Sequence, residues 1–236
     1  MALAIQICAY LIALPLQLLV IRALLQGPYR RYPFVFVYAI AIFLTTAVEA
    51  PLFFSYYAGN RKVENALVNL YWIDEAVLQV LVYAVVISFL YYATAALRSR
   101  RIVRIALIGG AVLFAGVSFQ MHYDPLTKHV GEWMTPWSRD LNFCSAILDL
   151  ALWTLLIAAR QKDHRLLMLS GALGIQFTGE AIGGSLRHLS QANRSALTTN
   201  IGDAVVVLTD LLFLYILWQT FREAKPKNGV RASKGE

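Results

Sequence analysis

Seven stretches of apolar residues follow one another along this chain, and they constrain its fold more than any other feature. Each holds about twenty residues, and a helix of that length crosses the roughly 30 Å of hydrocarbon in a bilayer. Hydrophobic residues make up 58% of the 236 residues and charged residues only 15%, which leaves no room for a soluble domain. The sequence therefore predicts an all-α, polytopic membrane protein with a single seven-helix transmembrane domain over residues 1–222. The predicted spans are 3–25, 34–57, 69–97, 103–121, 141–159, 165–187 and 200–221.

The placement of the basic residues predicts how the helices are oriented. Of the 21 Lys and Arg residues, 15 lie on the side that holds the connections after the first, third and fifth spans and the C-terminal tail. By the positive-inside rule, the N-terminus is then outside and the C-terminus cytoplasmic. Residues 223–236 are charged and are expected to form a disordered cytoplasmic tail. The net charge of +7 thus suits a surface near anionic lipid and calls for no nucleic acid. We expect a multi-pass protein of a cell membrane, most simply the inner membrane of a bacterium, with the lipid bilayer as its main partner.

Seven carboxylic acids interrupt the apolar stretches, and no Lys or Arg lies deep inside any of these stretches. An acid near the bilayer centre costs roughly 2.5–3.5 kcal/mol on insertion scales, so it normally faces the bundle interior and is paired, protonated or bound to a ligand. The missing basic partners are the main indication of function. The acids are Glu49, Asp74, Glu75, Asp149, Glu180, Asp203 and Asp210.

The depth of each acid follows from the direction of its span and a rise of 1.5 Å per residue. Five acids fall in the outer half of the membrane, whereas Asp149 and Asp210 fall near its middle. This gradient predicts a cavity that is open to the outside. Two alternatives remain open at single positions: Asp149 as a hydrogen-bonded tie between helices, and Asp203 as the N-cap or first-turn acid of the last span.

Helical spacing places further polar residues on the faces that carry the acids. Gln79 shares a face with Glu75, and Gln176 shares one with Glu180. Glycines on the sixth span, Gly179, Gly183 and Gly184, favour close approach of a neighbouring helix. The candidate ligand-binding or proton-binding residues are Glu49, Asp74, Glu75, Gln79, Asp149, Gln176, Glu180, Asp203 and Asp210.

An internal similarity raises the possibility of a duplication. Glu49 and Glu180 lie in similar segments 131 residues apart, and Asp74 and Asp203 lie in similar segments 129 residues apart. A parallel repeat of three spans, 1–97 and 141–221, with the fourth span as linker, would produce both spacings. Chance similarity between segments that consist of the same few apolar residue types would produce both spacings as well.

The topology is similar to that of seven-span sugar carriers of the SWEET type and of microbial rhodopsins, without shared motifs. Rhodopsins hold retinal through a lysine in their last span, and Asn200–Phe221 contains none, so a retinal Schiff base there is excluded. The sequence predicts no cofactor. Cys8 and Cys144 are expected to be buried free thiols rather than a disulfide. The segment His122–Asp140, with Trp133, Pro136 and Trp137, is expected to be a loop at the lipid–water boundary.

Three functions from different classes are compatible with these features. The first is binding or transport of a cation, or of a small solute with proton coupling, because close carboxylates in a low dielectric share protons or ionise when a cation arrives. The second is a small-ligand sensor or accessory subunit, whose protein partner the sequence does not identify. The third is a metal-dependent membrane enzyme that would add His122, His129 and His188 to the acids. These His residues form no metal-binding spacing, so the sequence favours a protein without catalytic residues.

Overall fold

The computed structural model of the chain describes residues 2–60, 63–94, 100–123, 130–158, 163–193 and 196–222. Within these residues it contains seven α-helices and one 3-10 turn, and each α-helix includes a segment long and apolar enough to cross a membrane. The prediction of an all-α, multi-pass integral membrane protein is confirmed at this level. The elements are α1 (Ala2–Leu25), η1 (Pro28–Arg30), α2 (Pro33–Tyr57), α3 (Glu64–Thr94), α4 (Arg100–His122), α5 (Val130–Ala158), α6 (His164–Asn193) and α7 (Ala196–Arg222).

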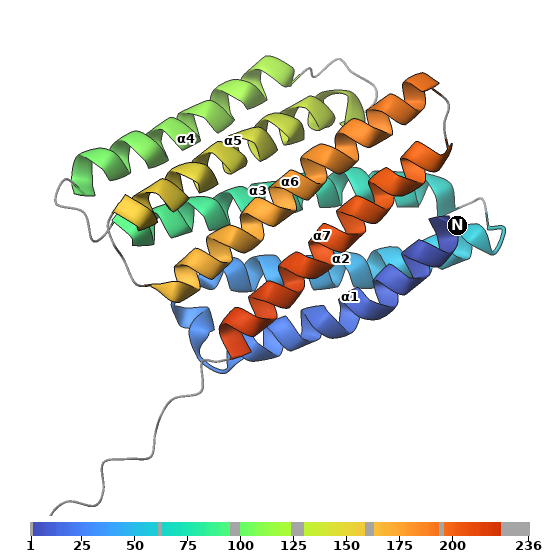
Figure 1. Cartoon of the computed structure of the whole chain (residues 1–236). Coiled ribbons are helices and arrows are strands. Elements are labelled where there is room, and N and C mark those ends of the chain that lie inside the picture. The colour runs from blue at the N-terminus through green and yellow to red at the C-terminus, as the bar shows by residue number, and fades with distance from the viewer. Residues whose placement is uncertain are drawn as a thin grey trace, which may run out of the picture.

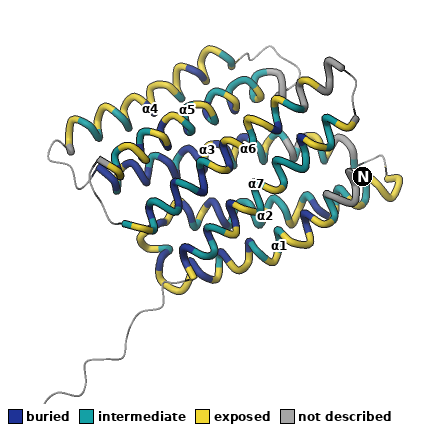
Figure 2. Tube along the Cα trace, in the orientation of Figure 1, coloured by how far each residue is buried: buried dark blue, intermediate teal, exposed yellow. Residues whose placement is uncertain are grey.

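Six of the helices form a ring, and α4 lies outside it (Figure 1). Around the ring, the neighbours are α1, α2, α3, α5, α6 and α7, and α7 packs against α1 to close it. Among the described residues, α4 packs mainly on α3 and α5, and Figure 2 shows that most of its length is exposed. Short connections make helices that are adjacent in sequence run antiparallel. As a result, α1, α3, α5 and α7 all begin at one end of the bundle, which we call the first end, and finish at the opposite, basic end.

Glycine and proline set the turns at which two of the helices stop and start. Gly27 lies between α1 and η1 with a φ of 140°, and Gly59 follows α2 with a φ of 99°. Residues other than glycine rarely adopt such positive φ values. Pro33 occupies the first position of α2, where its missing N–H costs no helical hydrogen bond. These residues produce the tight reversals that keep α1, α2 and α3 side by side.

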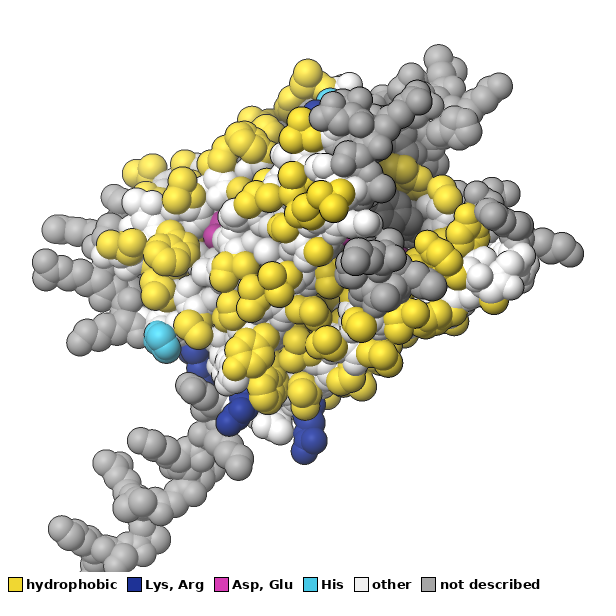
Figure 3. Space-filling model, turned by 45° about the vertical axis from the view of Figure 1, so that its right-hand side comes forward, with side chains coloured by type: hydrophobic (Ala, Val, Ile, Leu, Met, Phe, Trp, Pro, Cys, Tyr) yellow, Lys and Arg dark blue, Asp and Glu magenta, His cyan; other side chains and the backbone are white. Residues whose placement is uncertain are grey.

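The bundle presents apolar side chains outward and packs aromatic rings inside its basic end. Figure 3 shows a face made mostly of hydrophobic side chains, as expected of a surface that meets lipid, with most of the visible Lys and Arg side chains toward one end. Inside that end, the ring of Tyr32 contacts the rings of Phe89, Tyr92 and Phe221 at centroid distances of 5.7–6.1 Å. Tyr32, Phe89 and Phe221 are fully buried. The interior is therefore closed by close packing at the basic end.

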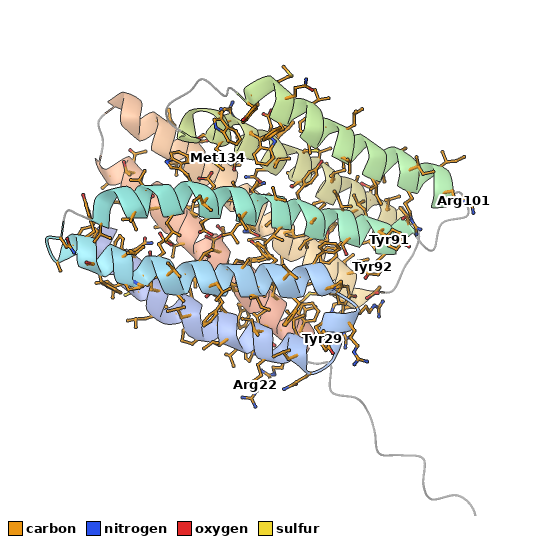
Figure 4. The ribbon with its side chains drawn as sticks, turned by 180° about the vertical axis from the view of Figure 1, so that it is seen from behind. Arg22, Tyr29, Tyr91, Tyr92, Arg101 and Met134 are labelled. Carbon is orange, nitrogen blue, oxygen red and sulfur yellow. The ribbon has the colours of Figure 1, made fainter. Side chains whose placement is uncertain are left out.

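Polar contacts at the same end connect four helices, α2, α3, α4 and α6. Arg31, just before α2, forms an ion pair with Asp163, just before α6, at 2.9 Å. The hydroxyl of Tyr92 on α3 donates to the backbone carbonyl of Arg31. The guanidinium of Arg104 on α4 lies 3.9 Å from the ring centroid of Tyr91. Figure 4 shows Tyr91 and Tyr92 at this end, together with the labelled arginines.

The predicted loop His122–Asp140 is wrong over most of its length, because α5 begins at Val130. Trp133 and Trp137 lie within α5 and pack their rings against Phe119 of α4 at centroid distances of 5.6 and 5.3 Å. This aromatic packing gives the start of α5 an apolar face and extends the helix beyond the hydrophobic stretch. α6 likewise continues to Asn193, past the expected end at 187. The predicted disordered tail, 223–236, lies outside the described residues.

The expectation of two buried thiols is wrong for Cys8. Both cysteines are free, but Cys8 is exposed on the outer surface of α1, where it would meet lipid, and Cys144 is half-buried. The Sγ atom of Cys144 lies 3.4 Å from the hydroxyl of Tyr83, which donates to the backbone carbonyl of Ala111 at 2.7 Å. Cys144 therefore belongs to the contact between α3, α4 and α5.

Candidate functional site

The six helices of the ring enclose a cavity of about 540 Å³ that extends from the middle of the bundle toward the first end. We call it the ring cavity. Its walls come from the middle parts of α1, α2, α3, α6 and α7 and from the first half of α5, and α4 contributes no described residue. Seven of the predicted site residues line it: Glu49, Asp74, Glu75, Gln79, Gln176, Glu180 and Asp210.

Glu180 is held on one side of the ring cavity by an amide from a neighbouring helix. The Nδ2 atom of Asn142 on α5 donates to the Oε2 atom of Glu180 on α6. Glu180 also interacts electrostatically with Asp210 on α7 and with Glu75 on α3. Carboxyl groups from three helices therefore influence one another here.

The remaining acids line the wall formed by α2 and α3. The Oγ atom of Ser138 on α5 donates to the Oε1 atom of Glu75 at 3.3 Å. Asp74, the preceding residue, interacts electrostatically with Glu75 and with Glu49 on α2. This side of the cavity thus holds a second group of carboxyl groups, and Glu75 interacts with both groups.

A buried tyrosine lies between the two groups of acids. The Nε2 atom of Gln176 is placed 3.1 Å from the hydroxyl of Tyr38 on α2, within hydrogen-bond distance. Tyr38 is 3% exposed and interacts electrostatically with Glu180, Asp210 and Asp74. The acids predicted from separate spans therefore converge on one region.

The first helix supplies a polar wall that the sequence reasoning missed. Gln6, Tyr10 and Gln17 all line the ring cavity. Their spacing of four and then seven residues places them on one face of a helix, which is the signal that would have revealed them. The Nε2 atom of Gln17 donates to the Oγ1 atom of Thr46 at 3.1 Å and so joins α1 to α2.

A basic side chain also lines the ring cavity, contrary to the expectation that the acids have none near them. Arg139 precedes the predicted fifth span, but because α5 begins at Val130 it lies within the membrane-spanning segment Trp133–Ile157. It is exposed rather than buried. The part of the cavity wall that the structure describes thus contains one guanidinium and five carboxyl groups.

Many polar atoms of the cavity wall lack a protein partner. Among the described residues, the structure has seven buried side-chain nitrogen or oxygen atoms without a hydrogen-bond partner, and six of them belong to residues that line this cavity. Such atoms are rare in protein interiors and call for water or a ligand. The six residues are Tyr10, Gln17, Asp74, Gln79, Asn142 and Gln176.

Two predicted site residues, Asp149 and Asp203, lie away from the ring cavity. Asp149 on α5 is 4% exposed and accepts a hydrogen bond from the Oγ atom of Ser170 on α6 at 2.6 Å. It matches the alternative of a tie between helices. Asp203 is neither the N-cap nor a first-turn acid, because α7 begins seven residues earlier at Ala196. It makes contacts of its own but does not line the cavity.

The histidines considered for a metal-dependent enzyme do not join the acids of the cavity. The Nε2 atom of His122 lies 3.0 Å from the Oδ2 atom of Asp140, which also accepts a hydrogen bond from Ser118 at 2.8 Å. This arrangement connects α4 to α5. His129 and the side chain of His188 lie outside the described residues. Among the described residues, no three His, Cys, Asp or Glu side chains lie close enough to hold a metal ion.

Comparisons of the chain with protein-family models, with curated proteins and with solved structures found no match.

Proposed function

We propose that this protein binds a cation or a small solute in the ring cavity, from the outer side of the membrane, and couples its binding or passage to proton movement. The observation that carries the proposal is the convergence of Glu49, Glu75 and Glu180, from three helices, on a single cavity. Carboxyl groups at membrane depth are costly and are retained where they serve an ion, a proton or a ligand.

Proton coupling follows from the closeness of the acids. Glu180 is surrounded by Asp210 on α7, Glu75 on α3, Tyr38 on α2 and Asn142 on α5. Neighbouring carboxyl groups in a low dielectric do not titrate independently, and a cation that enters favours their ionised forms. Binding of a positive ligand would therefore release protons, and protonation would release the ligand.

The shape of the bundle supports access from one side. The ring cavity extends from the middle of the bundle toward the first end, whereas the rings of Tyr32, Phe89 and Phe221 fill the interior at the basic end. The positive-inside rule predicts that the basic end faces the cytoplasm. A ligand would then enter from outside, and passage through the membrane would require the aromatic packing to open.

The proposal can be tested with purified protein in lipid vesicles that contain a pH-sensitive dye. The probes are sodium chloride, potassium chloride, glycine, glucose and butylammonium chloride, each added at several pH values. We expect at least one probe to move protons. We expect Glu49→Gln and Glu180→Gln to weaken that response by about tenfold or more, because each removes a charge from the cavity wall.

Asp203→Asn provides the matched control, since Asp203 is a membrane-embedded acid outside the cavity. It should leave the response close to that of the native protein. An unchanged response in both glutamine variants would remove the proposal. A loss of equal size in Asp203→Asn would show that any acid in the membrane matters, whether or not it lines the cavity.

A further inference from the structure

We propose that the ligand of the ring cavity is a small organic ammonium ion, whose N–H groups bond to carboxylate and amide oxygens of the cavity wall while its hydrocarbon part lies against apolar side chains. This inference rests on the proposed function and specifies the chemical class of its ligand. It is carried by the kinds of polar atom that the wall leaves without partners.

The orientation of the Gln17 amide is fixed by its neighbour. The Oγ1 atom of Thr46 donates its hydrogen to the backbone carbonyl of Ile42 at 2.7 Å, so it can only accept from Gln17. Gln17 must therefore turn its NH₂ group toward Thr46. Its Oε1 atom, on a side chain that is 2% exposed, is left as a buried acceptor without a protein donor.

On the opposite side of the ring, an ionised Glu180 can only accept, and it orients the Asn142 amide. Its Nδ2 atom donates to the carboxylate of Glu180, which leaves its Oδ1 atom buried and without a donor. The Oδ1 atom of Asp74 is a third buried acceptor without a partner. Helices α1, α3 and α5 thus each direct a free acceptor to the cavity wall, and a ligand that satisfies them must donate hydrogen bonds.

The unpartnered donors among the described cavity residues do not change this requirement. The hydroxyl of Tyr10 can accept as well as donate. Gln79, which is 9% exposed, has an unpartnered Nε2 atom. The oxygen and nitrogen of an amide exchange places by a half-turn of the group, so Gln79 can present either one. Among the described residues of the wall, Arg139 adds a single positive charge, against five carboxyl groups. Charge and hydrogen bonding therefore both favour a positive ligand that carries N–H donors.

The size and the apolar part of the wall favour an organic ion over a bare metal ion. A volume of about 540 Å³ is in the usual range for small-molecule sites, roughly 300–1,000 Å³. Leu78, Leu211 and Phe213 line the same cavity and would pack against a hydrocarbon group. An ion of a few ångströms would leave these side chains without contacts.

The test compares four probes on the native protein in detergent, by ligand-induced change in unfolding temperature and by equilibrium binding. The probes are butylammonium chloride, butyltrimethylammonium chloride, butan-1-ol and sodium chloride. Butyltrimethylammonium keeps the charge and the hydrocarbon chain of butylammonium but has no N–H donors. Butan-1-ol keeps the chain without the charge, and sodium is a cation without a chain. We expect butylammonium to bind about tenfold or more tightly than each of the others, since only it combines charge, N–H donors and hydrocarbon.

Gln17→Met tests the contact itself, because it keeps the length of the side chain and removes its acceptor. We expect it to weaken butylammonium binding about threefold to tenfold, the usual effect of one lost hydrogen bond, and to leave butyltrimethylammonium unchanged. Gln219→Met is the matched control, since Gln219 bonds to Tyr215 on the same helix and does not line the cavity. The probe comparison on the native protein stands even if Gln17→Met fails to fold.

The outcomes separate this inference from the proposed function. Equal binding of butylammonium and butyltrimethylammonium, or of butylammonium and butan-1-ol, would overturn the assignment of an N–H-bearing ion. Proton movement with sodium or glucose that depends on Glu180, without any with butylammonium, would overturn it while supporting the proposed function. If none of the four probes binds, the ammonium assignment is wrong, and the proposed function then depends on the remaining probes of its own experiment.

Discussion

Two acids on neighbouring helices show how the surroundings of a residue decide what it can do. Asp149 on α5 is 4% exposed, and the hydroxyl of Ser170 on α6 donates to it at 2.6 Å. Glu180 on α6 instead lines the ring cavity beside Asp210 and Glu75. Both acids interrupt apolar stretches, so their sequence context is alike. Each accepts a hydrogen bond across the contact between α5 and α6, and what distinguishes them is that Glu180 borders a cavity and Asp149 does not.

The tie between Asp149 and Ser170 predicts a cost for removing the hydroxyl. Ser170→Ala leaves a buried oxygen of Asp149 without its donor, and hydrogen bonds between membrane helices contribute on average about 0.6 kcal/mol and at most about 1.7 kcal/mol. We expect a loss of about 1 kcal/mol or more, because both side chains are fully enclosed. Reversible unfolding of the purified protein in mixed micelles measures it.

Ser185→Ala is the control for this substitution. Ser185 lies on the same helix, is exposed, and donates only to the carbonyl of Ala181 in its own helix. Its loss should change the free energy of unfolding by less than about 0.5 kcal/mol. Equal costs for the two variants would mean that the contact with Asp149 contributes nothing specific.

Charged and neutral polar residues differ in how readily the sequence reveals them. Glu49 and Glu180 were predicted as site residues because a carboxyl group in an apolar stretch is costly enough to require an explanation. Gln17 and Tyr38 line the same cavity. However, amides and phenols are common in membrane helices, so a single one in the sequence does not indicate a site. Their role became evident only when α1 and α2 were placed beside the acids.

At the scale of single elements, α5 shows why a hydropathy average misplaces a helix end. Its first turns contain Ser138, Arg139 and Asp140, which lower the average and suggest a loop. In the structure, Ser138 and Arg139 line the cavity, whereas Trp137 packs against α4. The segment is therefore an amphipathic helix whose polar face borders the cavity. An average of hydropathy over consecutive residues combines the polar and apolar faces of the helix, so it does not detect an amphipathic segment.

The contact between α6 and α7 depends on glycines, which have no side chain. The glycine spacing predicted this close approach, and the structure has it at two of the three positions. A Cβ atom at Gly179 would collide with the side chain of Thr209, and one at Gly183 would collide with Val206 and lie 2.9 Å from the backbone oxygen of Gly202. Small residues let membrane helices approach closely and gain van der Waals contact. The third position, Gly184, lines the ring cavity and has open space around it.

This packing predicts opposite effects for adjacent glycines. Gly183→Ala should destabilise the protein by about 1–3 kcal/mol, because the backbone of α7 must move to accept the methyl group. Gly184→Ala should be neutral or should stabilise by up to about 1 kcal/mol, since alanine is the better helix former. Unfolding in mixed micelles compares the two. Similar losses at both positions would contradict the contact between α6 and α7 described above.

At the scale of the whole molecule, the order of helices around the ring suits the predicted duplication. If α1, α2 and α3 correspond to α5, α6 and α7, the contact between α3 and α5 becomes the contact between α7 and α1, and both contacts occur. α4, the proposed linker, lies outside the ring. The acids follow the correspondence only in part, since Glu49 and Glu180 both line the cavity but Asp203 does not. The duplication stays a prediction.

The number and order of the spans could be predicted from hydropathy, because each helix must by itself satisfy its backbone and bury about twenty apolar side chains in lipid. The closure of the ring between α1 and α7 could not. It joins the two ends of the chain and depends on which faces of α1 and α7 match in shape. Hydropathy does not identify those faces, because lipid-facing and core-facing residues are equally apolar here. Leu11 and Leu24 on α1 illustrate this, with exposures of 69% and 0%.

The orientation of the whole bundle yields a prediction that bears on every functional statement above. In a background with Cys8→Ala and Cys144→Ala, single cysteines at Asn60 and Gln26 place a thiol at an exposed turn on each end of the bundle without removing a charge. The positive-inside rule predicts that a membrane-impermeant maleimide labels Asn60→Cys in intact cells and Gln26→Cys only after the membrane is permeabilised. The reverse pattern would place the ring cavity toward the cytoplasm. Its lining would be unchanged, but a ligand would then enter from inside, and the aromatic packing around Tyr32 would lie on the outer side.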